Sequence, residues 1–208
     1  MKYQTPQEDF WAGEFGDGYI ERNQYPGLYA KRTAHFARIL QSIPGGGGIR
    51  SALELGPNIG VNLIALRRLI PGFRATGIEI NEKAAKECAK IPDVTVVQDA
   101  FLNYKSDETF DLTFTYGVLL LQNPETLPAL YDILYEHSNR YIFMCEYYNP
   151  TPVTVPYRGF TDRIFKRDFA GELMDCHPDV QLVDYGFFYH RDKFFPEDDS
   201  NWFLMEKR

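Results

Sequence analysis

Short apolar runs alternate along this chain with segments in which apolar residues recur at every third or fourth position. The runs cover residues 50–55, 75–80, 94–97, 110–115 and 140–145, and their length is typical of buried strands. The intervening segments, such as 60–70 and 127–134, have the period of helices that pack one face against a core. Regular alternation of strand and helix predicts a parallel sheet with helices on both faces.

Capping signals mark where several of these helices begin and end. Pro71 and Gly72 end the helix 60–70, and Asn81 stands where its side chain can cap the next helix. Asn123 followed by Pro predicts another helix start. Pro128 removes an early hydrogen bond from that helix, so we expect an irregular first turn.

The last part of the chain breaks the alternation. A helix near 168–175 is followed by two β-rich runs, 180–189 and 202–206, with a polar stretch between them. Strands joined without a helix pair most simply as antiparallel neighbours. The sequence therefore predicts an α/β fold, a doubly wound, mostly parallel, seven-stranded Rossmann-like sheet that ends in an antiparallel hairpin.

The N-terminal region is predicted to be helical. Residues 28–43 have helical periodicity, whereas residues 7–23 mix aromatic residues with acids and glycines. Trp11, Tyr19 and Arg22 either belong to a lid over a ligand site or pack as ordinary core, and both roles are compatible.

We expect a single domain over residues 1–208, with N-terminal helices in 1–43 that act as a lid and an α/β core in 49–208. The glycines at 45–48 lie between them. A phosphate cradle would follow a strand, whereas these glycines precede one, which favours a flexible spacer.

Composition limits the range of functions. The chain has 208 residues, 44% of them hydrophobic, which is enough for one sizeable core. Its net charge of −7 argues against duplex nucleic acid as a partner, because such a partner requires a basic face. No apolar run is long enough for a signal peptide or a membrane span, so we expect a cytoplasmic protein, monomer or homodimer, with no membrane partner.

The three cysteines give no sign of a metal site. Cys88, Cys145 and Cys176 are widely spaced, with no Cys-x-x-Cys pair and no His/Cys cluster. We therefore expect reduced thiols and no metal.

The candidate chemistry begins at the turn after the first predicted strand, Glu54-Leu-Gly56-Pro-Asn58-Ile-Gly60. In doubly wound sheets this turn lies in the ligand crevice at the carboxyl ends of the strands. Gly56 and Gly60 allow the backbone to approach a ligand, and Asn58 tolerates a left-handed conformation. The spacing lacks a glycine of the G-x-G-x-x-G dinucleotide fingerprint, which weakens an NAD interpretation.

Acidic residues follow or lie in the next strands. Glu79 ends the second strand, where a carboxylate can accept both ribose hydroxyls of an adenosine. Asp99 follows the third strand, where it can accept an adenine amino group, and Asp111 lies in the fourth. Each acid alone is equally compatible with a helix cap or a solvated strand end. Their register with successive strands favours a ligand site.

These residues together resemble the class I S-adenosylmethionine-dependent methyltransferases. The glycine turn is similar to the first motif of that family, Glu79 to its ribose-binding acid, and residues 110–117 to its fourth-strand motif. The resemblance implies S-adenosyl-L-methionine as cofactor. The cofactor-binding residues that we expect are Trp11, Tyr19, Arg22, Glu54, Gly56, Asn58, Gly60, Asn62, Glu79, Ile80, Asp99, Ala100, Thr115, Tyr116 and Gly117.

A closer resemblance covers nearly the whole chain. It is to the methyltransferases associated with pseudaminic acid biosynthesis in bacteria. The blocks that carry it are residues 10–17, Tyr19, 21–23, 53–60, 117–119, 123–124, 146–152, 156–159, 165–171, 184–187, 189–192, 198–199 and 202–204. This resemblance implies a sugar of the nonulosonic acid pathway, or its nucleotide-linked precursor, as the acceptor.

The chain departs from that family at two positions. Tyr116 and Leu121 stand where the family carries a Lys and a His. If the family His serves as a base, this chain lacks it, and its acceptor or its base differs.

Candidate residues on the acceptor side follow the fifth and sixth strands. Arg158 is either a bidentate clamp for a carboxylate or phosphate or the partner of a local acid. His190 is the first choice as general base, against a surface or core-bonded histidine. The catalytic candidates are His190, Tyr147 and Glu146, and the substrate-binding candidates are Tyr148, Asn149, Tyr157, Arg158 and Asp192.

Four functions remain open at this point. The first is methyl transfer to a hydroxyl or amino group of a bacterial sugar, and the second is N-methylation of an amino acid, amine or guanidine metabolite. The third is a dinucleotide-dependent oxidoreductase. The fourth is a non-catalytic protein that binds S-adenosylmethionine.

Overall fold

The computed structural model describes residues 5–22, 25, 27–43, 48–157 and 159–208, and of residues 22 and 160–162 it describes the backbone alone. The glycine spacer predicted at 45–48 therefore lies, except for Gly48, outside the described residues.

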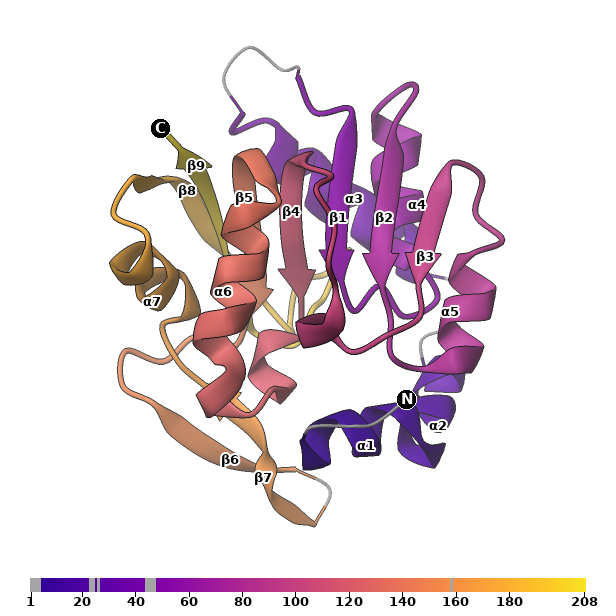
Figure 1. Ribbon diagram of the computed structural model, residues 1–208, viewed down its shortest axis with the longest axis vertical. Coiled ribbons are helices and arrows are strands. Elements are labelled where there is room, and N and C mark those ends of the chain that lie inside the picture. Colours follow the sequence, from indigo (N-terminus) through magenta and orange to yellow (C-terminus); the bar gives the residue numbers. More distant parts are fainter. Residues whose placement is uncertain (1–4, 23–24, 26, 44–47, 158) are drawn as a thin grey trace.

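Seven strands form one sheet (Figure 1). β1 to β5 pair in parallel, and β9 runs antiparallel to both β5 and β8. The predicted fold class is thus confirmed, including the hairpin. The strands, in their order across the sheet, are β3 (Val94–Val97), β2 (Arg74–Ile78), β1 (Ser51–Leu55), β4 (Phe110–Tyr116), β5 (Ser138–Glu146), β9 (Ser200–Lys207) and β8 (Val180–Phe188).

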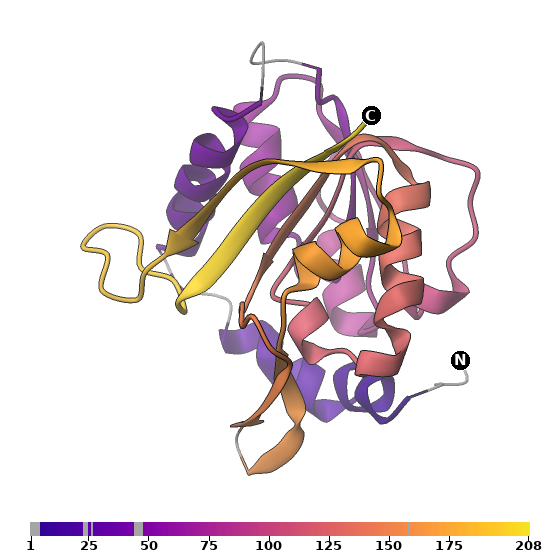
Figure 2. The ribbon, with the colours of Figure 1, turned by 90° about the vertical axis from the view of Figure 1, so that its left-hand side faces the viewer.

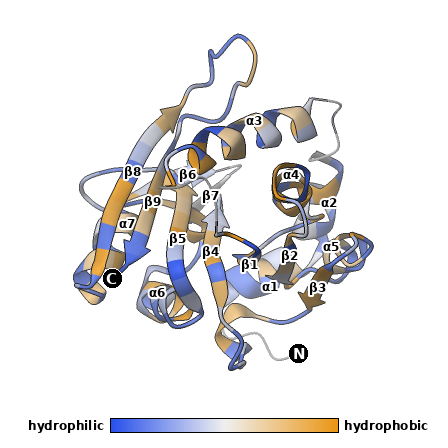
Figure 3. Ribbon diagram, turned by 90° about the horizontal axis from the view of Figure 1, so that it is seen from above, coloured by the Kyte–Doolittle hydropathy of each residue, from blue (hydrophilic) through white to orange (hydrophobic). Residues whose placement is uncertain are grey.

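Helices cover both faces of this sheet (Figure 3). On one face, buried side chains of α3 (Leu28–Leu40) and α4 (Val61–Leu69) pack against β1, β4 and β5 around Phe114. On the other face, α6 (Leu127–Glu136) and α7 (Phe169–Cys176) pack around Ile142. A two-layered core of this kind leaves the carboxyl ends of the parallel strands free for a ligand site.

The predicted caps are present. The Asn81 side chain accepts a hydrogen bond from the backbone N–H of Ala84 at the start of α5 (Glu82–Cys88). The Asn123 side chain caps a 3-10 turn, Pro124–Thr126, that leads into α6. This turn is the irregular start that Pro128 predicts.

Two short helices, α1 (Pro6–Ala12) and α2 (Glu14–Arg22), lie beyond the carboxyl edge of the sheet (Figures 1 and 2). Asp17 ties α2 to the start of α5: its oxygens accept from the side-chain amide of Asn81 at 2.9 Å and from Lys83 Nζ at 2.6 Å. The N-terminal helices therefore sit where the strand ends present their loops.

An additional hairpin, which the sequence analysis does not predict, follows the fifth strand of the parallel sheet. Residues Val153–Tyr157 (β6) and Phe160–Lys166 (β7) pair as antiparallel strands. Pro156 lies at a register shift, where the ladder does not need its missing N–H. The hairpin reaches the N-terminal helices, with the rings of Phe15 and Tyr157 6.4 Å apart.

Asp111 is a second correction. It lies at the amino end of β4, where its Oδ2 accepts from the backbone N–H of Arg50 at 2.7 Å and of Ser51 at 2.9 Å. It therefore joins the starts of β1 and β4 at the edge opposite the strand ends that carry the other acids. Within the described residues, no helix combines the length and the apolar character needed to cross a bilayer.

Candidate active site

A cavity lies at the carboxyl ends of β1, β2 and β4, beneath α1 and α2. Its space outside protein atoms, with the solvent at its mouth, is about 990 Å³. The sequence-predicted residues that line it are Trp11, Tyr19, Gly56, Asn58, Asn62, Glu79, Ile80, Ala100, Tyr116 and Gly117. Four loops and the N-terminal helices thus meet at the cavity, which we call the first cavity.

The turn after β1 has the backbone that its sequence predicts. Gly56, Asn58 and Gly60 have φ values of +71°, +51° and +80°, in the left-handed region. A Cβ on Gly56 would lie 2.8 Å from Cγ2 of Val118, which is too close. Glycine at this position therefore lets the turn after β1 approach the segment after β4.

Glu79 joins two loops at the floor of the first cavity. One carboxylate oxygen accepts from the backbone N–H of Asn58 and the other from that of Asn81, both at 2.8 Å. Burial raises the pKa of the Glu79 carboxyl, although the hydrogen bonds from the backbone act to lower it. Each oxygen keeps a lone pair that can accept from a ligand.

Asn62 lines the first cavity and pairs with Glu54, which is fully buried behind the cavity wall and does not line it. The Asn62 amide donates to Glu54 Oε1 at 2.6 Å. Among the described residues, the other oxygen of each side chain has no hydrogen-bond partner. Burial raises the pKa of Glu54 to about 8. A cationic ligand would favour the ionised forms of Glu54 and Glu79, whereas a pyrophosphate would oppose them.

The segment after β3 contributes backbone and an apolar ring. Ala100 and Phe101 line the first cavity. Asp99 does not line it, because its Oδ1 accepts from the backbone N–H of Ala100 at 2.7 Å and from the Asn103 amide at 2.8 Å. Of the predicted pair Asp99-Ala100, only Ala100 thus reaches the cavity, whereas Asp99 shapes the turn.

A second cavity adjoins the first, with about 1170 Å³ of space outside protein atoms, open solvent included. The residues that line both cavities are Trp11, Tyr19, Leu28, Arg32, Tyr116, Gly117 and Leu121. A ligand in the first cavity can therefore present a group to a ligand in the second across Gly117.

Aromatic rings form much of the second cavity. Trp11 and Tyr19 meet edge to face with their centroids 5.3 Å apart, and Tyr25, Tyr147 and Tyr157 complete the aromatic wall. Burial raises the pKa of Tyr147, so its phenol stays protonated at neutral pH.

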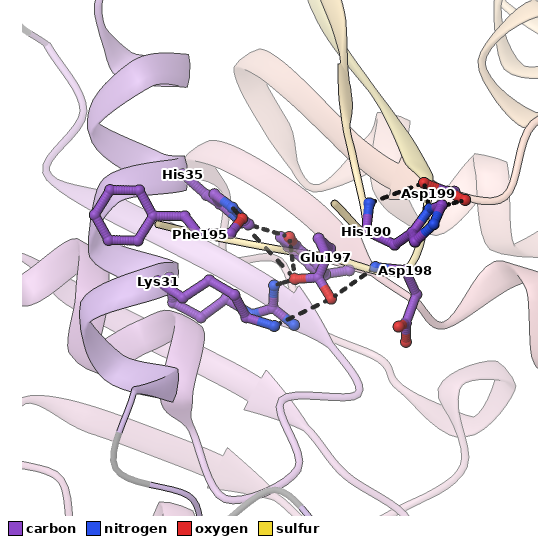
Figure 4. A network of polar contacts seen from close by, with 9 residues as sticks. Lys31, His35, His190, Phe195, Glu197, Asp198 and Asp199 are labelled. Carbon is purple, nitrogen blue, oxygen red and sulfur yellow. Dashed lines mark hydrogen bonds and ion pairs between the residues drawn. The ribbon is translucent and has the colours of Figure 1, made fainter. Parts of the chain in front are cut away.

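A charged network joins this cavity to α3 (Figure 4). Glu197 accepts from Arg32 and from Lys31, and also from the hydroxyl of Tyr116 at 3.1 Å. The Arg32 guanidinium lies 3.7 Å from the centroid of the Tyr116 ring. Although burial opposes its charge, Arg32 and Lys31 hold the pKa of Glu197 below its usual value.

The catalytic candidate Glu146 lines the second cavity but is occupied by backbone donors. Its two oxygens accept from the N–H groups of Val118, Leu119 and Leu120 at 3.1 to 3.2 Å. Burial raises its pKa to about 7. Glu146 therefore fixes the turn after β4, which forms the wall shared by the two cavities.

His190 and Asp192 line neither cavity. His190 is exposed, and its Nδ1 lies 2.7 Å from Asp199 Oδ2. Asp192 accepts from the backbone N–H groups of Phe194 and Phe195, and these bonds lower its pKa. The structure thus gives no support to His190 as base or to Asp192 as a substrate contact.

Several other candidates lie away from the two cavities. Tyr148 packs against Phe203, with ring centroids 5.9 Å apart, and the Asn149 amide donates to the carbonyl of Thr151. Gly60 and Thr115 lie behind the first cavity without lining it. Arg158 lies outside the described residues, and only the backbone of Arg22 is described.

Sequence reasoning missed the charged side of the site. Lys31, Arg32, Glu197 and Asp198 all line the second cavity, yet they come from a helix and a loop far apart in the chain. The only sequence signal for this charged side was the pair Asp198-Asp199, which belongs to the family resemblance.

The chain has no match among family models, and no curated protein matches its sequence. Solved methyltransferase structures share its fold. The magnesium protoporphyrin IX methyltransferase ChlM from Synechocystis PCC 6803, with bound SAH, has a TM-score of 0.71 at 13% identity, over 97% of this chain and 98% of that one.

Two further structures are similar. The 1,6-didemethyltoxoflavin-N1-methyltransferase of Burkholderia thailandensis, with S-adenosylhomocysteine, has a TM-score of 0.70 at 13% identity, over 100% of this chain and 92% of that chain. The glycopeptide N-methyltransferase MtfA, complexed with S-adenosyl-L-methionine, has a TM-score of 0.62 at 14% identity, over 88% of this chain and 94% of that chain. These likenesses establish the fold, a Rossmann-like sheet of the methyltransferase type.

The buried Glu54 predicts a pH dependence of stability. Its pKa is about 8 in the folded chain and near 4.5 when exposed, so the folded state binds the extra proton between these values. The free energy of unfolding should therefore fall as pH rises from about 5 to 8, and Glu54→Gln should reduce that fall. Urea denaturation of the ligand-free protein across this range measures it; equal slopes in both proteins would contradict the assignment.

Proposed function

We propose that this protein is an S-adenosylmethionine-dependent methyltransferase. Its acceptor is a hydroxyl or amino group of a small molecule, a bacterial sugar of the nonulosonic acid pathway. The observation that carries the proposal is the pair of adjoining cavities at the strand ends. One has the buried carboxyl of Glu79 and a glycine turn without side chains, the other has aromatic rings and charges, and they share a wall at Tyr116 and Gly117.

The residues of the first cavity suit this cofactor, which supplies a methyl group activated by a positive sulfur. Glu79 keeps acceptor capacity for the ribose hydroxyls, and Ala100 and Phe101 offer a surface for the adenine. Asn62 lines this cavity, and an ionised Glu54 directly behind it suits the ammonium of the amino-acid part. Glu79 at the floor of the cavity and Glu54 behind its wall thus favour a cationic ligand.

The same features argue against a dinucleotide. The negative pyrophosphate of NAD beside the turn after β1 would oppose ionisation of Glu54 behind that turn, and the turn lacks the third glycine spacing of the dinucleotide fingerprint. We therefore favour methyl transfer over the oxidoreductase hypothesis.

The second cavity supports a sugar acid as acceptor. Aromatic faces such as those of Trp11 and Tyr157 pack well against the C–H groups of a sugar ring. Lys31 and Arg32 share one carboxylate, Glu197, and keep N–H donors for a carboxylate of the acceptor. An amine acceptor is the alternative, favoured by the carboxylate of Asp198 in the same cavity.

The two departures from the family lie where the cavities meet. Tyr116 and Leu121 each line both cavities. A leucine cannot exchange a proton, and burial raises the pKa of Tyr116 well above its usual value. These observations support the inference that the chain differs from its resembled family in its base or its acceptor.

The N-terminal helices act as a lid in this proposal. Trp11 of α1 and Tyr19 of α2 line both cavities, and Asp17 anchors α2 to Asn81 and Lys83. A covering of this kind excludes water from the site and aligns the reactants, and alignment alone is worth roughly 7–11 kcal/mol in favourable cases.

Isothermal titration tests the cofactor. We expect heat with S-adenosylmethionine and none with NAD. Glu79→Ala should weaken the binding by about 1–3 kcal/mol, because a charge-assisted hydrogen bond to the ribose is lost. Glu82→Ala, at an exposed acid that pairs with Lys86, is the matched control and should leave the affinity unchanged. Heat with NAD alone would refute the proposed cofactor, and an unaffected Glu79→Ala would refute the ribose site.

Mass spectrometry with isotope-labelled cofactor tests the acceptor. We expect labelled methyl on sugar acids of a panel that also contains neutral sugars and amines. Lys31→Gln should raise KM for an acidic sugar more than for a neutral one, because the variant lacks a cation for the carboxylate. Label on amines alone would select the alternative, and label on no small molecule of a broad extract would favour a non-catalytic binding protein.

A further inference from the structure

We infer, on the basis of the proposed function, that Asp198 is the catalytic group that takes the proton from the acceptor hydroxyl. Asp198 lines the second cavity, and its side chain turns away from the charged network in Figure 4. The segment between β8 and β9 is built to hold it in this place.

The other carboxylates of the second cavity are already occupied. Glu146 accepts three backbone N–H groups, and Glu197 accepts from Arg32, Lys31 and Tyr116. Among the described residues, no hydrogen bond or ion pair engages the carboxylate of Asp198. Its backbone N–H donates to the side chain of Glu197. A general base needs a lone pair that faces the substrate, and Asp198 supplies it.

Three buried ionisable groups of that cavity do not compete with Asp198. Burial raises the pKa of Tyr147, of Tyr116 and of the Cys145 thiol, which keeps all three protonated at neutral pH. Tyr147 lines the same cavity as Asp198, whose negative charge contributes to the raised pKa of that phenol. The phenol of Tyr147 can thus help to orient an acceptor toward Asp198.

The chain on either side of Asp198 is tied down. On one side, Glu197 is clamped to α3, and its N–H donates to the carbonyl of Tyr189 at 3.3 Å. On the other side, Asp199 adopts a φ of +48° and accepts from both the backbone N–H and the ring Nδ1 of His190, at 2.9 and 2.8 Å. His190 is therefore a positioning residue that acts through Asp199.

The step balances with these groups alone. The acceptor oxygen forms a bond to the methyl carbon, the bond from that carbon to the cofactor sulfur breaks, and its electron pair remains on the sulfur. The hydroxyl proton passes to the Asp198 carboxylate and later to solvent. The products are a methyl ether and S-adenosylhomocysteine.

Asp198→Asn tests this assignment, with labelled S-adenosylmethionine as donor and a polar bacterial extract as the source of acceptor. We expect turnover to fall about 10²- to 10⁴-fold, the typical contribution of a general base, while cofactor affinity by titration stays within about twofold. Asp175→Asn, at an exposed acid of α7 that lines neither cavity, is the matched control and should keep full turnover. Asp198→Glu should recover part of the loss.

The pH profile separates a base from a merely structural residue. Turnover of the unsubstituted protein should fall at acid pH, and Asp198→Asn should lack that fall. His190→Ala should lower turnover less and keep the fall. Turnover of Asp198→Asn within about threefold of the unsubstituted protein would overturn the assignment. An unsubstituted protein that binds the cofactor but labels nothing would instead refute the proposed function.

Discussion

The structure of the site depends on buried carboxylates that accept the backbone N–H groups of neighbouring loops. Glu79, just after β2, joins the turn after β1 to the start of α5. Glu146, at the end of β5, holds the turn after β4. An unsatisfied donor at such buried positions would cost about 1–3 kcal/mol, so each carboxylate determines the path of a loop. The two cavities and their shared wall follow from these paths.

Local sequence signals were sufficient for the sheet and for the loops that form the first cavity. Strand 94–97 and the caps at Asn81 and Asn123 follow from short patterns whose physical causes lie within a few residues. Glycine and asparagine in the turn after β1 determine its left-handed backbone in the same way. The β6–β7 hairpin was missed because Pro156 is typical of a loop, and only the register shift around it accommodates a proline in the ladder.

The acceptor side could not be predicted, because its contacts join distant parts of the chain. Arg32 and Glu197 are 165 residues apart, and no spacing in the sequence encodes their pairing. His190 was the natural candidate for a base by residue type, yet its ring faces Asp199 outside both cavities. The placement of Asp198 depends on two contacts, Arg32 with Glu197 and His190 with Asp199. Both exist only in the folded chain.

The central claim is that one adenosine-bearing cation occupies the first cavity and points its sulfur at the second. A crystal structure with S-adenosylhomocysteine tests it most directly. The account predicts ribose oxygens within hydrogen-bond distance of Glu79, adenine beside Ala100 and Phe101, and sulfur near Gly117. A ligand bound elsewhere, or a first cavity closed by side chains from α1 and α2 under saturating ligand, would contradict it.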